Sequence, residues 1–565
     1  MNKMATIVEK TSSGIIYKAS QQRDFPQLDL LSLLFDSSAC GAKEDTVVHA
    51  DAADPSKAVS KAQLRHLVKR LAYTLRQRYG IGQDGPEKDV VLCISSGHFL
   101  LPCLFYSTIA AGAIFSASSP ASTATELAGQ IKQIGAKLIL CNEDTKEVAA
   151  AAAKLANIPD SRVLVLGLQP NLKLTSLEQS ILIPISTETL EWQRITDTKA
   201  LENSIICILF SSGTTGLPKM CRLSHTNMVS QACLVLDPAR EYEKARGRGI
   251  SADYRTIAHL PAAHIAGVQG YFVNSFYAGG TLYWMPRFNL VKFLEYSKKY
   301  QITTLVSVPP IYLAIAKSPL VTDQFDSVEW AVAGAAPMGK ELQLAARKKL
   351  GKGKAHLTQT WGLSETTGAM TTMPRGIDDE TGSVSMLVMN GQARIVDDDG
   401  KDVEPGQAGE LWVKGPNVTK GYYMNDAANK EAFVEGWFCT GDIGLFKDGK
   451  FYIVDRKKEL IKYKGLQVAP AELEALLVSH AKIADAAVIG VDGEETEVPR
   501  AYVVAGDATL KAEEIVDWVA SKVANHKKLR GGVVFIDAIP KSPSGKILRK
   551  ELRQLAKRID KGSKL

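Results

Sequence analysis

Six short apolar runs, rich in β-branched residues and separated by helical segments, constrain the fold of this chain most strongly. They cover residues 89–95, 136–141, 162–167, 204–212, 302–310 and 329–337. Each run is nearly continuous in apolar character, which is typical of strands buried on both faces of a largely parallel sheet. Helices are expected between them, at 62–79, 123–134 and 290–300. The chain as far as about Asn390 is therefore predicted to be α/β.

After about Gln392 the pattern changes to short alternating strands separated by tight turns. Segments with this pattern are 392–403, 409–415 and 442–454. Asp-Gly pairs between alternating apolar residues are typical of antiparallel hairpins. A second, antiparallel kind of sheet is therefore expected here.

The C-terminal part of the chain predicts a small α+β domain. Following Asp455, a basic stretch leads into helices expected at 470–480 and 511–523, with apolar strands between and after them. Such a unit of roughly a hundred residues lies within the usual size range of a domain. Two domains are therefore expected, at 1–455 and 456–565.

Composition limits the class of protein and of ligand. An apolar fraction of 45% with 23% charged residues is that of a globular protein, and 565 residues are too many for one ordinary core. The net charge of +7 is mild and spread along the chain, which favours an anionic small molecule over a nucleic acid. The eight cysteines are far apart and lack metal-ligand spacing, so reduced thiols are expected and a structural zinc is not.

A targeting signal is indicated at the C-terminal end of the sequence and not at the N-terminal end. Residues 1–18 lack the apolar core of a secretory signal, and the apolar run 99–115 is slightly short for a bilayer and is interpreted as a buried helix. Ser563, Lys564 and Leu565 spell the address read by a peroxisomal import receptor. The peroxisomal matrix is therefore the predicted location, with an ordinary charged tail as the alternative.

The segment LFSSGTTGLPKM, residues 209–220, almost matches a Walker A phosphate loop. Gly213 and Lys219 have the required spacing, but Pro218 replaces the second glycine and Met220 the magnesium-binding hydroxyl. Backbone N–H groups and hydroxyls in such a loop can form a nest for anions. Polyphosphate binding is therefore preferred to a plain Gly/Ser-rich connection.

Three further motifs each allow a functional and a structural interpretation. In QTWGLSETTG, Glu365 could hold Mg²⁺ against phosphates, or be an acid at a helix start after a serine cap. In GWFCTGDIG, Asp442 could bind ribose hydroxyls or be a residue of a tight turn. In IPKSPSGKILRKELR, Lys546 could act on developing phosphate charge or be an exposed lysine.

Together these four motifs, in this order, resemble the adenylate-forming superfamily of acyl-CoA synthetases, firefly luciferases and free-standing adenylation domains. The likeness is greatest to the 4-coumarate:CoA ligase and luciferase branch. It extends from about Leu30 to Leu552 and includes GAAP and YIVDRKKELIKYKGLQVAPAELE. The resemblance implies a large multi-subdomain N-terminal domain with mostly parallel sheets plus a small distorted barrel, and a small mobile α+β C-terminal domain.

The resemblance also implies an ATP-dependent first step, in which a carboxylate attacks the α-phosphate of ATP to form acyl-AMP and pyrophosphate. Glu365 would hold Mg²⁺, and Lys546 would bridge the carboxylate and α-phosphate oxygens. The implied nucleotide-binding residues are Ser211, Ser212, Gly213, Thr214, Thr215, Gly216, Lys219, Ala335, Ala336, Thr360, Trp361, Ser364, Asp442 and Arg456.

In the implied second step, the thiol of CoA displaces AMP after the C-terminal domain has turned about a hinge at Lys458. Lys462 and Gln467 match positions that serve the site in one arrangement or the other. The residues implied to bind CoA are Arg287, Lys464 and Gly465.

The acid would lie in a mainly apolar pocket. Its implied lining is His264, Ile265, Ala266, Gly270, Thr360, Gly368 and Ala369. His264 would stand beside the carboxylate, although a core histidine is the alternative. Ile265 replaces the aspartate that pairs with the amine of amino-acid substrates, so an α-amino acid is disfavoured. Ala266 and Thr360 depart from the coumarate-ligase pattern, and an aryl, aryl-alkyl or medium-chain acid is expected.

Three functions follow from these patterns. The first is an acid:CoA ligase that uses ATP, Mg²⁺ and CoA. The second is an enzyme that uses the adenylate without CoA, as a luciferase-like oxygenase or a carrier-protein loader. The third is a non-catalytic nucleotide-binding protein, which the presence of Lys219, Glu365, Asp442, Arg456 and Lys546 in one chain disfavours.

Overall fold

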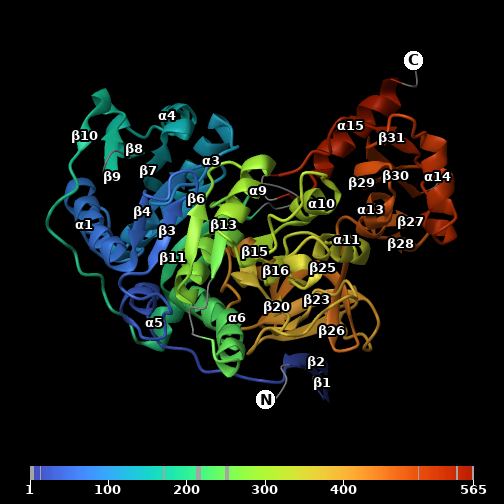
Figure 1. Cartoon of the computed structure of the whole chain (residues 1–565), viewed down its shortest axis with the longest axis horizontal. Coiled ribbons are helices and arrows are strands. Elements are labelled where there is room, and N and C mark those ends of the chain that lie inside the picture. Colours follow the sequence, from blue (N-terminus) through green and yellow to red (C-terminus); the bar gives the residue numbers. More distant parts are fainter. Residues whose placement is uncertain are drawn as a thin grey trace.

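The computed structural model describes residues 5–12, 14–168, 172–211, 218–248, 254–493, 496–542 and 545–562. A large N-terminal part carries mixed and parallel sheets, and a small C-terminal part, red in Figure 1, lies at one end of the molecule. The predicted α/β class and the division into a large and a small domain are confirmed.

The largest sheet has eight strands in the order β10-β9-β8-β7-β5-β6-β11-β12. Its centre, from β8 to β11, is parallel, and both edges are antiparallel. Its strands are β5 (Val90–Ile94), β6 (Ile114–Ser118), β7 (Ala136–Asn142), β8 (Val163–Leu168), β9 (Leu172–Ser176), β10 (Leu182–Ile183), β11 (Ile205–Ser211) and β12 (Lys219–Ser224).

Helices cover both faces of this sheet, as its continuous apolar strands require. Alternate residues of β5 point to opposite faces. Val90 and Leu92 pack with α3 (Ala124–Ile134) and α4 (Lys146–Leu155), whereas Val91 packs on the other side with α1 (Lys61–Tyr79) and α2 (Leu101–Ala110).

The expected buried helix in the run 99–115 is α2, of which every residue is buried. Among the described residues no helix is both long and apolar enough to cross a membrane. All eight cysteines are free, and seven of them are buried.

Two smaller groups of strands bring several loops to one edge. The four-stranded sheet contains β13 (Arg255–Ala258), β14 (Thr281–Trp284), β3 (Val47–Asp51) and β4 (Ala58–Ser60), and the three-stranded one β15 (Thr304–Ser307), β16 (Trp330–Ala333) and β17 (His356–Gln359). β15, β16 and β17 are parallel, so the segments that follow them leave from the same edge. Ligands of parallel sheets bind at such carboxyl ends.

The antiparallel unit is a seven-stranded sheet, where the resemblance implied a small distorted barrel. Its path runs β1-β2-β22-β23-β25-β24, with β26 beside β25, and within the described residues it does not return to β1. The hairpin of β1 (Thr6–Thr11) and β2 (Gly14–Ala19) was not expected from the sequence and joins the sheet through β22. The remaining strands are β22 (Gln392–Val396), β23 (Gly409–Lys414), β24 (Phe433–Val434), β25 (Trp437–Lys447) and β26 (Lys450–Arg456).

The C-terminal domain follows β26 through a turn at 457–459, which is where the domain boundary is expected. Its three-stranded sheet packs with α13 and α14 around one apolar cluster and with α15 around another. The elements are β27 (Ile461–Tyr463), β28 (Leu466–Val468), α13 (Pro470–Ser479), β29 (Ile483–Asp492), β30 (Glu497–Ala505), α14 (Ala512–Ala520), β31 (Val533–Phe535) and α15 (Arg549–Gly562). The predicted α+β character is confirmed.

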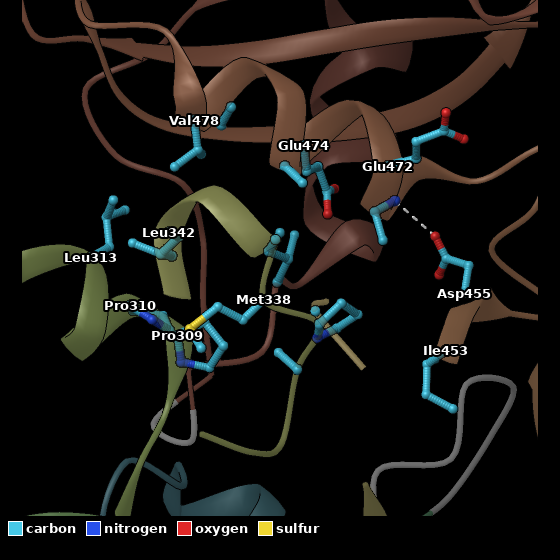
Figure 2. Close-up of a pocket in the computed structure, with 18 of the residues that line it drawn as sticks. Pro309, Pro310, Leu313, Met338, Leu342, Ile453, Asp455, Glu472, Glu474 and Val478 are labelled. Atoms are coloured by element: carbon cyan, nitrogen blue, oxygen red, sulfur yellow. Dashed lines mark hydrogen bonds between the residues drawn. The ribbon is translucent and has the colours of Figure 1, made fainter. Parts of the chain in front are cut away.

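The two domains face each other across α10 (Pro309–Lys317) and α11 (Lys340–Arg347) on one side and α13 on the other (Figure 2). Lys317, at the end of α10, donates hydrogen bonds to the carbonyls of Val478 and Ile483 in the C-terminal domain. Closer to the centre, a Cβ built on Gly545 would lie 3.2 Å from Pro310 Cγ and from Val308 Cγ2. The loop that carries Lys546 therefore rests directly on the N-terminal domain.

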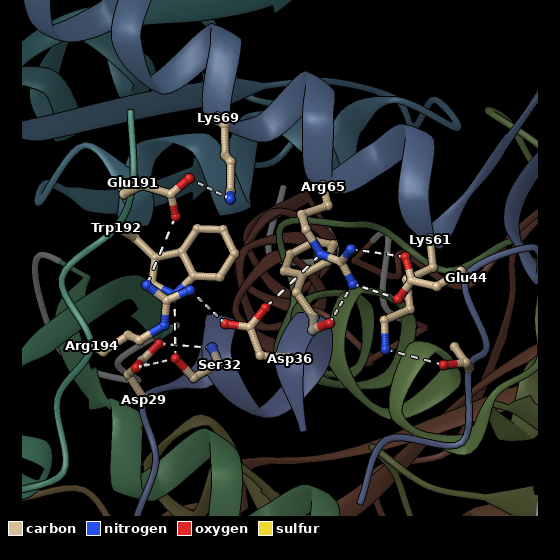
Figure 3. A network of polar contacts seen from close by, with 12 residues as sticks. Asp29, Ser32, Asp36, Glu44, Lys61, Arg65, Lys69, Glu191, Trp192 and Arg194 are labelled. Atoms are coloured by element: carbon tan, nitrogen blue, oxygen red, sulfur yellow. Dashed lines mark hydrogen bonds and ion pairs between the residues drawn. The ribbon is translucent and has the colours of Figure 1, made fainter. Parts of the chain in front are cut away.

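A polar network fastens the segment around residue 32 to the N-terminal domain (Figure 3). Asp29 is buried and accepts hydrogen bonds from the amide and the hydroxyl of Ser32. The indole of Trp192 donates to the same hydroxyl at 3.3 Å. Arg65, from α1, forms a two-pronged ion pair with Glu44 at 2.8 and 2.6 Å. The geometry of the Arg65–Glu44 pair is specific, because a planar guanidinium matches both carboxylate oxygens.

We predict that Lys317→Met loosens the contact between the domains. A hydrogen bond from a charged donor contributes about 1.5–3 kcal/mol, so cleavage by trypsin in the 457–459 turn should become at least about five-fold faster. Lys349→Met is the matched control, because Lys349 donates to Val321 within the N-terminal domain. Equal cleavage rates in the two variants would contradict a role for Lys317 in holding the domains together.

Candidate active site

A cleft of about 1020 Å³ lies between the two domains. Its outer wall is apolar, and Figure 2 shows Pro309, Pro310, Leu313, Met338 and Leu342 facing α13. At its inner end the cleft is lined by residues from both domains, namely Ala335, Ala336, Thr360, Trp361, Asp442, Arg456 and Lys546. Seven residues that the sequence resemblance assigned to the nucleotide or to catalysis are thus brought to one place.

Asp442 is held by two neighbours at the floor of the cleft. It is the cross-strand partner of Arg456, whose Nε lies 3.0 Å from Asp442 Oδ1. The indole Nε1 of Trp361 donates to Asp442 Oδ2 at 2.8 Å. Asp442 lies within the eleven-residue strand β25, so the turn proposed as its structural alternative is wrong. Asp442 and Arg456 form the terminal pair of the β25–β26 ladder, directly after Gly441, whose φ is +70°.

The segment after β16 approaches the cleft with strained backbone. Ala335 has a φ of +71°, in the left-handed region that residues with a Cβ rarely adopt. A Cβ on Gly334 would lie 3.0 Å from the methyl group of Thr360, and the Thr360 hydroxyl donates to the carbonyl of Thr371 at 2.6 Å. Thr360 is therefore fixed against this loop, as a wall of the cleft beside Ala335 and Ala336.

Lys546 reaches the cleft from the loop before α15. Burial, followed by the charge of Arg456, lowers the pKa of its ammonium to about 8, while Asp442 and Glu459 act in the opposite direction. Its amide donates to the hydroxyl of Ser542 at 3.1 Å, which holds the loop in shape. A buried ammonium beside a guanidinium is costly unless an anion lies between them. The arrangement is therefore suited to an anionic ligand.

His264 lies at the start of the short helix α7 (Ile265–Gly267), and its Nδ1 accepts the amide of Ala266 at 3.3 Å. Because Nδ1 is an acceptor, the ring proton of the neutral form lies on Nε2. Burial, and then the charge of Lys546, lowers the pKa of His264 to about 4. The ring is therefore a neutral N–H donor at physiological pH.

Glu365 lies in a one-turn 3₁₀ helix (Ser364–Thr366) with no side-chain cap, so the alternative of a serine-capped helix start is not what the structure has. The hydroxyl of Tyr422 donates to Glu365 Oε1 at 2.9 Å, and the Lys219 ammonium lies 4.9 Å from the centre of the Tyr422 ring. Among the described residues Oε2 of Glu365 accepts no hydrogen bond. Sequence reasoning missed Tyr422, because nothing in the local pattern marks its contact with two distant residues.

The near-Walker loop connects two antiparallel strands. Ser211 ends β11 and is paired with Lys219, which begins β12. A Walker A loop instead opens directly into a helix, whereas here α6 (His225–Ala245) begins only after β12. This strand was not anticipated; it contains Met220 and begins directly after Pro218. Five of the implied nucleotide-binding residues lie outside the described part of the chain, namely Ser212, Gly213, Thr214, Thr215 and Gly216.

The residues assigned to the acid meet around α7 and the π-helix that follows it (Val268–Asn274). A Cβ on Gly270 would meet no atom within 4 Å, and one on Gly368 would lie 4.0 Å from Ile265 Cγ1. Ile265 is buried, whereas Ala266 and Ala369 are half-buried. The segments around residues 265 and 368 are thus adjacent, with open space at Gly270.

The residues assigned to the second step do not line this cleft. Lys462, Lys464, Gly465 and Gln467 are exposed on the β27–β28 hairpin, whose backbone is bonded to Glu497 and Thr496. Arg287 follows β14, is largely exposed and pairs with Asp144 at 3.2 Å. Lys458 is exposed in the turn between the domains. Their proposed roles therefore need a different arrangement of the two domains.

The family is decided by comparison with known proteins. Residues 35–423 match the family of AMP-binding enzymes, and residues 472–546 match the AMP-binding enzyme C-terminal domain. The chain belongs to the AMP-binding enzymes. Within this family it is an enzyme of the acid:thiol ligase class, the adenylate-forming group expected from the motifs.

Several relatives of this AMP-binding enzyme are similar over most of their length. A protein of Emericella nidulans assigned as an acyl-coenzyme A synthetase is 48% identical, covering 96% of this chain and 98% of its own. A phenylacetyl-CoA ligase of Aspergillus niger is 35% identical (94% and 97%), and the 4-coumarate–CoA ligase of Pinus taeda is 39% identical (80% and 82%). The ATP-bound structure of MatB from Rhodopseudomonas palustris has a TM-score of 0.79 at 26% identity, covering 94% of this chain and 99% of that one.

We predict that adenylation by this enzyme declines above pH 8. A lysine whose pKa is lowered to about 8 is protonated below that pH and loses its charge above it, so kcat/KM for ATP should fall about ten-fold per pH unit beyond it. Pyrophosphate exchange without CoA measures this step. Lys546→Arg should remove the decline, because a guanidinium keeps its proton.

Lys541→Arg is the control, since Lys541 pairs with Asp485 of its own domain. A decline at the same pH in Lys546→Arg would show that another group titrates.

Proposed function

We propose that this AMP-binding enzyme joins an aryl, aryl-alkyl or medium-chain carboxylic acid to CoA by way of an acyl-AMP. The observation that supports it most directly is the entry of Lys546, from the C-terminal domain, into the cleft that holds Asp442, Arg456 and Trp361. These four residues come from separate motifs, so only the folded chain brings them together. Acid:CoA ligation is also the activity that the names of the full-length relatives describe.

In the first step, an oxygen of the acid forms a bond to the α-phosphorus of ATP and the bond to pyrophosphate breaks. Two anions must approach each other, and Lys546 lies where its charge can be shared between them. A pair of unit charges 4 Å apart is worth roughly 4 kcal/mol at the effective dielectric of a protein site. The neutral N–H of His264 can hold the acid's carboxylate, while Asp442 can exchange its contacts with Trp361 and Arg456 for ribose hydroxyls.

Mg²⁺ is proposed to bind at Glu365. Within the described residues one carboxylate oxygen accepts no hydrogen bond, while Tyr422 orients the other. Mg²⁺ is usually held by one or two carboxylates plus phosphate oxygens. Within the described residues no group of three or more acidic, histidine or cysteine side chains forms a separate metal site. When bound, the ion would supply charge neutralisation at the phosphates. Lys219, beside the same tyrosine, would add positive charge at the departing pyrophosphate.

The second step is proposed to follow a rotation of the C-terminal domain about Lys458. The hairpin that carries Lys462 and Gln467 lies away from the cleft, so it can reach the acyl-AMP only if the domain turns. The thiol of CoA then forms the thioester and AMP leaves. Conformational steps of this kind complete a catalytic site and often limit turnover.

Lys546→Ala tests the assignment of the two steps. We predict that release of AMP and pyrophosphate from ATP with a panel of aryl and fatty acids, in the presence of Mg²⁺ and CoA, falls at least about a hundred-fold. Thioester formation from a supplied acyl-AMP should be largely retained, because the second step uses another face of the domain.

Equal loss of both half-reactions would contradict the role given to Lys546. Adenylation by the unmodified protein without any thioester would instead favour the luciferase-like or carrier-loading alternative. No turnover with any acid would overturn ligase activity altogether.

Import into the peroxisomal matrix is proposed from Ser563, Lys564 and Leu565, which lie outside the described residues. A receptor reads such a tripeptide as an address, so removing it abolishes import without affecting the fold. Deleting these three residues from a fluorescent fusion carrying them at its free end should leave the protein in the cytosol. Unchanged peroxisomal fluorescence would refute the assignment.

A further inference from the structure

One buried amide beside the residues assigned to the acid has donors that no residue in the described part of the chain uses. Gln231 lies in α6 and is 1% exposed. Its Oε1 accepts a hydrogen bond from Asn417 Nδ2 at 3.1 Å. Among the described residues, however, Nε2 of Gln231 donates no hydrogen bond. A donor that meets no protein acceptor can bond a polar group of a ligand that enters the space beside it.

Asn417 fixes the direction in which this amide points. Its Nδ2 also donates to the carbonyls of Thr366 and Ala369, at 3.1 and 3.2 Å. Two backbone acceptors therefore decide which end of the Asn417 amide is the nitrogen, and that nitrogen in turn faces Gln231 Oε1. Nε2 of Gln231 is directed away from Asn417.

The nitrogen faces the space beside Gly368. A Cβ built on Gly368 would lie 3.6 Å from Gln231 Nε2 and 4.0 Å from Ile265 Cγ1. Gly368 and Ile265 are both residues assigned to the acid pocket. Because Gly368 has no side chain, no side-chain atom at this position lies between Gln231 Nε2 and the acid pocket.

We propose that Gln231 is a specificity-determining residue that selects acids carrying an uncharged hydrogen-bond acceptor where their tail passes Gly368. An ether, carbonyl or hydroxyl oxygen would satisfy Nε2, whereas a purely hydrocarbon tail would leave it unpaired. Sites built to bond a polar group reject analogues that lack it. The inference rests on the proposed ligase function and on the acid occupying this pocket.

The test moves one oxygen along a fixed substrate length. Octanoate is compared with five analogues, in each of which one CH₂, from position 3 to position 7, is replaced by oxygen. The kcat/KM for thioester formation is measured for each acid. For oxygen at one or two adjacent positions, the kcat/KM of the oxygen-containing acid is divided by that of octanoate. This ratio should be at least about five-fold higher in the unmodified enzyme than in Gln231→Met. Methionine keeps the length of the side chain but has no N–H.

Gln269→Met is the matched control. Gln269 is also buried, but its Nε2 already donates to the carbonyl of Met228 at 3.1 Å and to Asn274 Oδ1 at 2.9 Å. Its loss should leave the ratios unchanged. Because both acids are measured on the same preparation, a lower folded fraction cancels from each ratio, and Gln231→Leu provides a second variant of different shape.

The possible outcomes distinguish failure of the role given to Gln231 from failure of the proposed ligase function. Thioester formation with unchanged ratios at every oxygen position in both Gln231 variants would overturn the role of Gln231 while leaving the ligase function intact. Absence of any thioester or acyl-AMP with the unmodified enzyme would overturn the proposed function itself.

Discussion

The cationic inner end of the cleft is the constraint on which the site depends. Lys546 and Arg456 come from different sides of the domain junction, and Asp442 is the acidic residue that faces both. Burial of the Lys546 ammonium beside the partly exposed Arg456 guanidinium is unfavourable unless an anion binds between them. In the proposed function the phosphates of the nucleotide supply that charge, so binding of the nucleotide would stabilise this arrangement of the two domains.

The surrounding fold places these charged residues and the walls of the cleft close together. Parallel strands deliver the segments around Ala335 and Trp361 from one edge, and the antiparallel pair β25–β26 delivers Asp442 and Arg456 opposite them. Gly545 allows the loop of Lys546 to approach Pro310 closely. The proposed second step would exchange one set of catalytic groups for another by moving the C-terminal domain as a unit.

Much of this could be predicted from the sequence, because local patterns determine local structure. Continuous apolar runs gave the buried strands, and the small α+β domain followed from its own pattern. The β1–β2 hairpin and strand β12 were missed, since their stability comes from pairing with residues far along the chain. Asp442 was misplaced in a turn for the same reason, because its place in β25 depends on pairing with strands that local spacing does not reveal.

By itself, the sequence determined the α/β class, the adenylate-forming motifs and the residue types available for chemistry. Tertiary structure alone decided which of those residues meet, because long-range packing is not encoded in local spacing. It brought Lys546 to Asp442, joined Tyr422 to Glu365, and left the hairpin of Lys462 outside the cleft. It also oriented the amide of Gln231, whose Nε2 donates to no described residue, because that orientation depends on Asn417, 186 positions away.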